Sequence, residues 1–215
     1  MPDPAPTSKP APTPTPAASE GFDPYEFWIL HKTRIIAFAG LLAVALGGYG
    51  LFSLQQSRTS DAAKAAYAKA KTADDFRKVA SEYASLPTGG NAQLSLASLL
   101  REEGKLDEAN TTLRAFIDRN PQHLMLAGAW LALAENAETA GKVDEGLAGY
   151  QKVLTTFPSS FAAPLALLGQ ARLQKTKGQN DLAKRSYEQV IAQYQGTPFH
   201  MEAQRELATL NKITP

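Results

Sequence analysis

Cysteine is absent from this 215-residue chain, which excludes disulfide bonds, thiolate metal sites and thiol nucleophiles. An excess of charge of one sign is also lacking, because 22 basic and 21 acidic residues give a formal net charge of +1. Nucleic-acid binding requires a strong positive field that this balance does not provide. We therefore expect no nucleic-acid partner, and any affinity must come from shaped local surfaces.

Catalytic signatures are scarce as well. No phosphate-binding glycine loop or metal motif is present, and the histidines lack a repeating acidic or nucleophilic partner: His31, His123 and His200. The acid pairs 107–108 and 144–145 lie 37 residues apart, which favours electrostatics at helix starts over acid–base chemistry. We expect no enzyme, no metal site, no cofactor and no small-molecule substrate. A hydrolase or transferase would need a cluster of polar catalytic residues, and we find no such cluster in the sequence.

The most informative feature that is present is a motif that returns every 37 residues. Residues 104–109, GKLDEA, recur as residues 141–146, GKVDEG, and more loosely as residues 178–183, GQNDLA. A repeat of this length is one supersecondary unit that buries its apolar face only by stacking on its neighbours. The spacing therefore predicts a repeat array with an extended surface suited to binding.

The register extends beyond the motif. Steps of 37 link two apolar columns and one column of alanine: Phe76, Leu113, Tyr150 and Tyr187; Val79, Phe116, Val153 and Val190; Ala97, Ala134, Ala171 and Ala208. An invariant alanine suits a site where two helices approach so closely that only a methyl group fits. Prolines that mark helix boundaries follow at Pro87, Pro121, Pro158 and Pro198.

Each unit reads as a helix, a short turn and a second helix. In the middle unit the amphipathic stretches are residues 124–140 and 143–157, separated by Gly141. Acidic residues near the start of each second helix face the positive end of the helix dipole: Asp107, Asp144 and Asp181. The segment 198–211 reads as a final helix that covers the last apolar face with Ala203, Leu207, Ala208 and Leu210.

These units resemble the tetratricopeptide repeat family. The middle unit matches the spacing of the family signature with Trp130, Leu133, Ala134, Gly141, Gly146, Tyr150 and Pro158. Each unit is three residues longer than the usual 34, and the excess lies between Pro121 and Trp130 and between Pro158 and Leu167, so the first helices should start early. The resemblance implies an all-α, right-handed solenoid of antiparallel helix pairs with a C-terminal capping helix over residues 58–215, counting a degenerate N-terminal unit.

A second segment, residues 35–54, contains no charged residue and at about 1.5 Å per residue spans about 30 Å, the thickness of a bilayer core. We interpret it as one transmembrane helix within residues 25–57. A cleaved signal sequence is the weaker alternative, because the preceding region and the apolar run are long and no small-x-small cleavage site follows. Ala39, Ala43 and Gly47 form a small-residue stripe that would let another helix pack closely, although such residues are common in membrane helices.

Residues 1–24 form a proline-rich tail that we expect to be disordered. Its Pro-x-x-Pro spacing suits a docking domain, but a solvated tail is the simpler interpretation. Basic residues lie on both sides of the apolar segment, Lys32 and Arg34 before it and Arg58, Lys64, Lys69 and Lys71 after it. The charge rule therefore leaves both membrane orientations open.

The family geometry implies an inner groove lined by first-helix residues. Its rows are Leu94, Leu131, Leu168 and Arg205; Ser98, Glu135, Arg172 and Thr209; Arg101, Glu138, Lys175 and Lys212. Such a groove is apolar at one edge and charged at the other, and it suits an extended or helical peptide. The alternative is that the leucines simply complete the core. The lysine and asparagine clamp that some family members use to grip a C-terminal carboxylate is not reproduced.

One membrane helix followed by a repeat array also resembles the ancillary subunit of the bacterial Sec translocon. That resemblance, which rests on architecture, implies a single-pass protein of the bacterial inner membrane with a periplasmic repeat domain. It also implies partners among translocon subunits and periplasmic chaperones, to which translocated chains would be handed. A scaffold for another envelope process, such as cell-wall or secretion-machine assembly, is the alternative.

Overall fold

The computed structural model describes residues 24–213, and these residues form helices joined by short connections. The helices are α1 (Pro24–Lys69), α2 (Ala73–Glu82), α3 (Pro87–Glu102), α4 (Leu106–Arg119), α5 (Leu126–Thr139), α6 (Val143–Thr156), α7 (Ala162–Thr176), α8 (Asn180–Gln193) and α9 (Pro198–Ile213). Two compact units divide between Gln55 and Gln56. The predicted tail lies outside the described residues except for Pro24, which begins α1.

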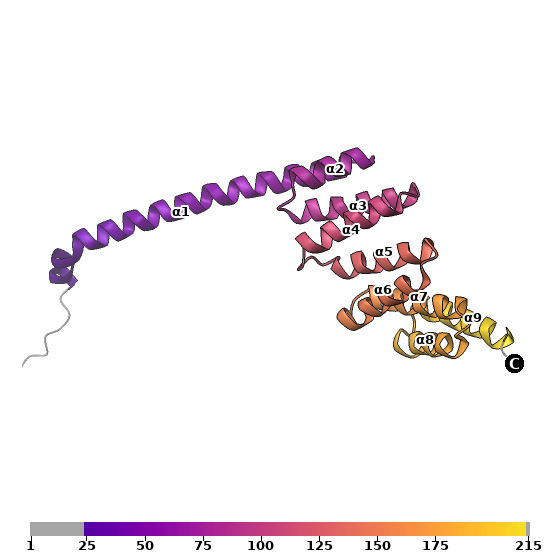
Figure 1. The fold of residues 1–215 in the computed structure, drawn as a ribbon. Helices are drawn as coiled ribbons and strands as arrows, with labels where there is room; N and C mark the ends of the chain where they lie inside the picture. Colours follow the sequence, from indigo (N-terminus) through magenta and orange to yellow (C-terminus); the bar gives the residue numbers. More distant parts are fainter. Residues whose placement is uncertain (1–23, 214–215) are drawn as a thin grey trace, which may run out of the picture. The chain divides into compact units, whose positions relative to one another are not determined.

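The second unit is the predicted stack of helix pairs. Consecutive helices from α2 to α9 pack on one another in chain order, and the first helices of neighbouring pairs, α5 with α7 and α7 with α9, also touch (Figure 1). The stretches predicted at 124–140 and 143–157 match α5 and α6 to within two residues. The degenerate first pair also exists, because Ala66 and Tyr67 at the end of α1 pack against Val79 of α2.

The repeated glycine makes the turn inside each pair. Gly104, Gly141 and Gly178 have φ angles of +76°, +71° and +72°, a left-handed conformation that costs little only for a residue without Cβ. In each case the next residue donates its backbone N–H to the carbonyl five positions earlier, as from Lys142 to Ala137 at 2.9 Å. This bond closes the end of the first helix, and its recurrence explains why the motif begins with glycine.

The predicted apolar columns form the core. Tyr150, Tyr187, Phe116, Val153 and Val190 are completely buried, each from the second helix of its pair. Ala134 lies so close to α6 that a Cβ added to Gly149 would come within 2.7 Å of the Ala134 methyl group. The alanine column is therefore a close helix–helix contact, as predicted for Ala97, Ala134 and Ala171, which are all buried.

The last member of that column is different, and the prediction for it was wrong. Ala208 of α9 is exposed, because no second helix follows α9 within the described residues to pack against it. The rest of the predicted cap is confirmed: Ala203 and Leu210 are buried in the same cluster as Tyr187, with Leu207 packed at its side. Helix α9 therefore seals α7 and α8 with one face and leaves the alanine face open.

The first unit contains the apolar part of α1. By length and composition this helix can cross a membrane, and its most apolar window has a mean hydropathy of 2.1 with no residue buried in the protein. Ala39, Ala43 and Gly47 are all exposed on it, and an added Cβ on Gly47 would meet nothing within 4 Å. The predicted span at 35–54 is thus helical, and almost all of its side chains are exposed.

Close packing in the stack gives a stability prediction. A Cβ at position 169 would lie 2.2 Å from the Tyr150 ring, so Gly169→Ala should lower the free energy of unfolding of the array by about 1–3 kcal/mol through overpacking. The matched control is Gly128→Ala, where the Cβ would meet the ends of two exposed side chains, the Phe161 ring at 3.0 Å and the Met125 methyl group at 3.6 Å. That change should be neutral or stabilising, since alanine favours a helix over glycine by about 1 kcal/mol. Thermal unfolding followed by circular dichroism compares the two, and equal effects would contradict the packing.

Candidate functional site

The predicted groove residues occupy the first helices of their pairs, and one cleft gathers four of them. Leu94, Ser98 and Arg101 from α3 meet Leu131 from α5 around a cavity of about 290 Å³. The helical period places the three α3 residues on one face, three and four positions apart. The cleft is therefore the part of the predicted groove that the structure brings together.

Several residues that line this cleft were not predicted for the groove, among them Met125 and Phe161. Met125 and Phe161 line it from the connections before α5 and α7, which contain the three extra residues of each unit. Helix α5 begins four residues before Trp130, and α7 begins five residues before Leu167. Met125 and Phe161 lie in the stretches that are longer than in the usual repeat, so the unusual repeat length marked these stretches but not the path of their side chains.

The apolar row of the predicted groove is not continuous. Leu131 is 6% exposed and Leu168 only 2%, and each belongs to a core cluster. Leu94 is half-buried and reaches the cleft directly. Toward α7 the leucine row therefore completes the core, whereas at α3 and α5 it forms the wall of a cavity.

The charged rows form ion pairs between neighbouring first helices. Arg101 of α3 donates to Glu135 of α5 at 2.7 Å, and Arg172 of α7 donates to both carboxylate oxygens of Glu138 at 3.0 and 3.1 Å. Both pairs join residues 34 positions apart. Further along, Glu206 of α9 lies 3.6 Å from the amine of Lys175 and 3.9 Å from the guanidinium of Arg205. The inner charges thus neutralise one another along the array.

Glu138 is the most constrained of these groups. Burial opposes its ionisation, but the hydrogen bonds from Arg172 and from the Tyr150 hydroxyl outweigh that effect and lower the pKa of Glu138. Burial and the neighbouring Glu138 carboxylate in turn raise the pKa of Tyr150, so its hydroxyl stays protonated and donates. The network ties α5, α6 and α7 together, since one residue comes from each.

The next repeat lacks this network. One step of 37 carries Tyr150 to Tyr187 and Glu138 to Lys175, so the acceptor is replaced by a cation. The Tyr187 hydroxyl is buried and has no hydrogen-bond partner among residues 24–213. Burial, followed by the charge of Glu206, raises the pKa of Tyr187 to about 12. The repeat that contains Tyr187 therefore lacks the hydrogen bonds that join the helices of the inner face in the repeat that contains Tyr150.

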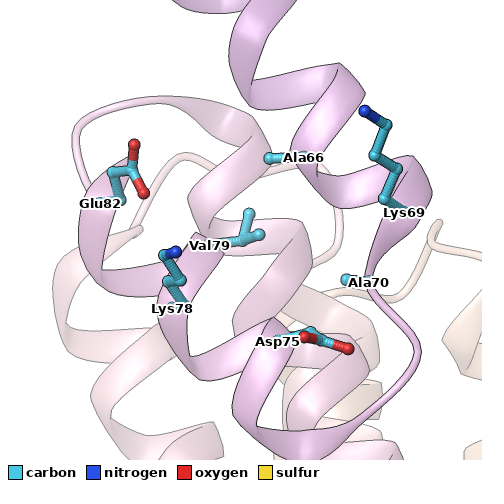
Figure 2. A pocket seen from close by; sticks show the side chains of 7 residues that line it. All are labelled: Ala66, Lys69, Ala70, Asp75, Lys78, Val79 and Glu82. Carbon is cyan, nitrogen blue, oxygen red and sulfur yellow. The ribbon is translucent and has the colours of Figure 1, made fainter.

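Two other hollows in the array are explained by packing. A groove of about 490 Å³ between α4 and α6 exposes one side of Trp130, with the Lys152 amine 5.5 Å from its ring centre, while the ring packs against the core as predicted. Figure 2 shows a shallower hollow of about 210 Å³ between the end of α1 and α2. There the Asp75 carboxylate accepts the Thr72 backbone N–H at 3.0 Å and is used as a helix cap.

A comparison with protein families matches residues 25–197 to the tetratricopeptide repeat-like domain. The chain belongs to this family. The match includes the apolar part of α1 as well as the helix pairs. Tetratricopeptide repeat-like domains generally bind proteins, so membership of the family suggests protein–protein interaction for the array.

Solved structures support the fold. A putative kinesin light chain of Podosopora anserina with nearly identical TPR-like repeats aligns with a TM-score of 0.53 and 21% identity, over 65% of this chain and 76% of that one. BtubC (BKLC) of P. vanneervenii aligns with a TM-score of 0.55 and 16% identity, over 73% of this chain and 66% of that one. At these identities the likeness concerns the fold alone. No curated protein matches the chain in sequence.

The Glu138 network predicts a dependence of stability on pH. Glu138→Gln should destabilise the array by about 1–3 kcal/mol at pH 7, because Arg172 loses its charged partner. Since the pKa of Glu138 is lowered in the folded state, its contribution is complete above 4.5, the ordinary glutamate value, and is lost as the pH falls through the lowered pKa. Chemical denaturation of both chains from pH 7 to pH 3 should show the difference shrinking. A difference that is constant with pH would contradict this assignment.

Proposed function

We propose that this protein is a membrane-anchored, non-catalytic binder that holds polypeptide segments in the cleft between α3 and α5. The observation that carries the proposal is the cleft itself, where Leu94, Met125 and Phe161 supply apolar walls beside the Arg101–Glu135 pair. Repeat arrays of this family expose such surfaces to protein partners. The long apolar helix α1 supports the anchor.

The chemistry of the cleft favours an apolar side chain of an extended or helical segment. The neighbouring cations are already paired with carboxylates at 2.7–3.1 Å, so a free carboxylate of a ligand would have to displace one of them. An apolar side chain needs no such exchange and gains from burial against Leu94 and Phe161. Specificity in this site would come from shape and apolar character rather than from the charge of the ligand.

At finer detail we propose that the chain works beside the Sec translocon in a bacterial inner membrane. Its array would lie in the periplasm and pass emerging chains to periplasmic chaperones. The single apolar helix followed directly by a repeat array supports this assignment, as does a cleft that selects apolar segments, which unfolded chains expose. A scaffold for another envelope assembly is the alternative, and it would use the same cleft for different clients.

Photocrosslinking tests the partner. A photoreactive amino acid in place of Ser98, which is exposed in the cleft, should capture translocon subunits and unfolded secreted chains in intact cells. The same amino acid in place of Gln189, which is exposed on α8, serves as the control. Recovery of cell-wall or secretion-machine components from position 98 would favour the scaffold, and identical products from both positions would contradict binding in the cleft.

A substitution in the cleft tests its role directly. Ser98→Arg should weaken capture of an apolar peptide about tenfold, because the long charged side chain fills the cavity at a central contact. The exposed position of Ser98 makes it a better choice than Leu131, where a charge would be buried and would destabilise the fold. Gln189→Arg adds the same charge on α8 and should leave affinity unchanged in fluorescence anisotropy titrations. An equal loss of affinity in both variants would show that the change in net charge, and not the filling of the cleft, weakens binding.

Protease protection tests the anchor and its orientation. In spheroplasts the array should be digested by protease added outside, and the chain should stay in the membrane after alkaline extraction. Digestion only after lysis would place the array in the cytoplasm and contradict the periplasmic assignment. Release by alkali would contradict the anchor.

A further inference from the structure

Charge is distributed unevenly between the two edges of the array. The loop edge consists of the connections into α3, α5, α7 and α9, residues 83–86, 120–125, 157–161 and 194–197, and it contains no Asp, Glu, Lys or Arg, although Glu82, Asp118 and Arg119 lie next to it. The turn edge consists of the turns inside the pairs, residues 70–72, 103–105, 140–142 and 177–179, and it carries Lys71, Glu103, Lys105, Lys142 and Lys177, with acidic residues close to each turn. Figure 1 shows the connections into α3 and α5 on the same side of the stack.

Exposed apolar side chains gather on the loop edge. Leu124 is 94% exposed and Phe161 52%, and the two occupy the same repeat position, 37 residues apart. Met125 beside Leu124 and Met201 in the first turn of α9 are also exposed. Among the described residues of the array, Leu182 is the one large apolar side chain exposed elsewhere. An apolar surface without charge, presented at successive repeats, marks an interaction site.

The chain enters the array at this edge. Residues 56–69 of α1 form the first helix of the first pair, because Ala63 is fully buried and Ala66 and Tyr67 pack against the cluster that contains Val79. Because successive helices are joined by short turns and run antiparallel, residues 56–69 run in the direction of α3, α5 and α7. At about 1.5 Å per residue this segment is about 21 Å long, like the 14-residue α5. Gln56 therefore lies at the loop edge, two residues after the predicted membrane span.

We propose that the loop edge docks on the surface of the lipid bilayer, with Leu124 and Phe161 inserted among the headgroups. The proposal rests on the membrane anchoring proposed above. The loop edge carries no ion that must be dehydrated on contact, and apolar and aromatic side chains are favoured in the interfacial region. The tether raises the effective concentration of the edge at the membrane, so a weak contact per residue is sufficient.

Docking in this way fixes the position of the inner cleft. Met125 and Phe161 belong both to the loop edge and to the mouth of the cleft, so the cleft opens next to the lipid surface. A polypeptide that leaves the membrane would meet the apolar mouth first. The charged turn edge would project into the aqueous phase, where its ions remain solvated.

The absence of cysteine allows a direct test on the full chain. Single labels are attached through Gln122→Cys and Ser159→Cys at the loop edge, which leave Leu124 and Phe161 in place, and through Ala140→Cys and Lys177→Cys at the turn edge. All four positions are exposed. The labelled chains are reconstituted in phosphatidylcholine–phosphatidylglycerol vesicles, and fluorescence quenching by a nitroxide on the lipid is measured. Quenching should be several-fold stronger at positions 122 and 159 than at 140 and 177.

A second variant tests the two proposed insertion residues. Adding Leu124→Asp and Phe161→Asp to the chain labelled at position 122 should reduce quenching to the level of the turn edge, while the helical circular dichroism signal stays unchanged. Equal weak quenching at all four positions in a chain that resists alkaline extraction would overturn the docking and leave the anchor intact. A chain that alkali removes from the vesicles would overturn both the anchor and the docking.

Discussion

The structure depends on the burial of each helix pair against the next. No pair can hide its apolar face alone, so the side chains that point out of one pair must fit the surface of its neighbour. Tyr150 is one of the tightest examples, because a Cβ added to Gly169 would lie 2.2 Å from its ring. Its hydroxyl reaches Glu138 on α5, which in turn holds Arg172 on α7. One buried aromatic residue thus connects the core to the charged rows of the inner face.

The fold was largely predictable because a 37-residue period carries the signals for helix, turn and core at once. Glycine at a left-handed turn, alanine at a close contact and proline at a boundary each have one physical role, so their recurrence fixes the pairs. The same reasoning failed at Ala208, where the residue type continues but the partner helix does not follow within the described residues. A column in the sequence predicts a contact only where both surfaces exist.

The candidate site was only partly predictable. Stepping by 37 found Leu94, Ser98 and Leu131 for the cleft, but it compared positions within a column and so gave no information on ion pairs between columns. Arg101 with Glu135 and Arg172 with Glu138 join different rows. The cleft also needed Met125 and Phe161, which lie in connections whose path the sequence does not determine. These pairs change the interpretation, because a surface of paired charges favours an apolar ligand.

The most direct test of the central claim is hydrogen exchange, measured by mass spectrometry on the full chain with and without a saturating apolar peptide. Stacked pairs with a shared inner face predict slow, cooperative exchange across α5 to α8, because these helices protect one another. Added peptide should slow exchange further in α3 and α5 and leave α8 unchanged. Independent exchange of each pair, or protection by peptide on α4, α6 and α8 instead, would contradict the account.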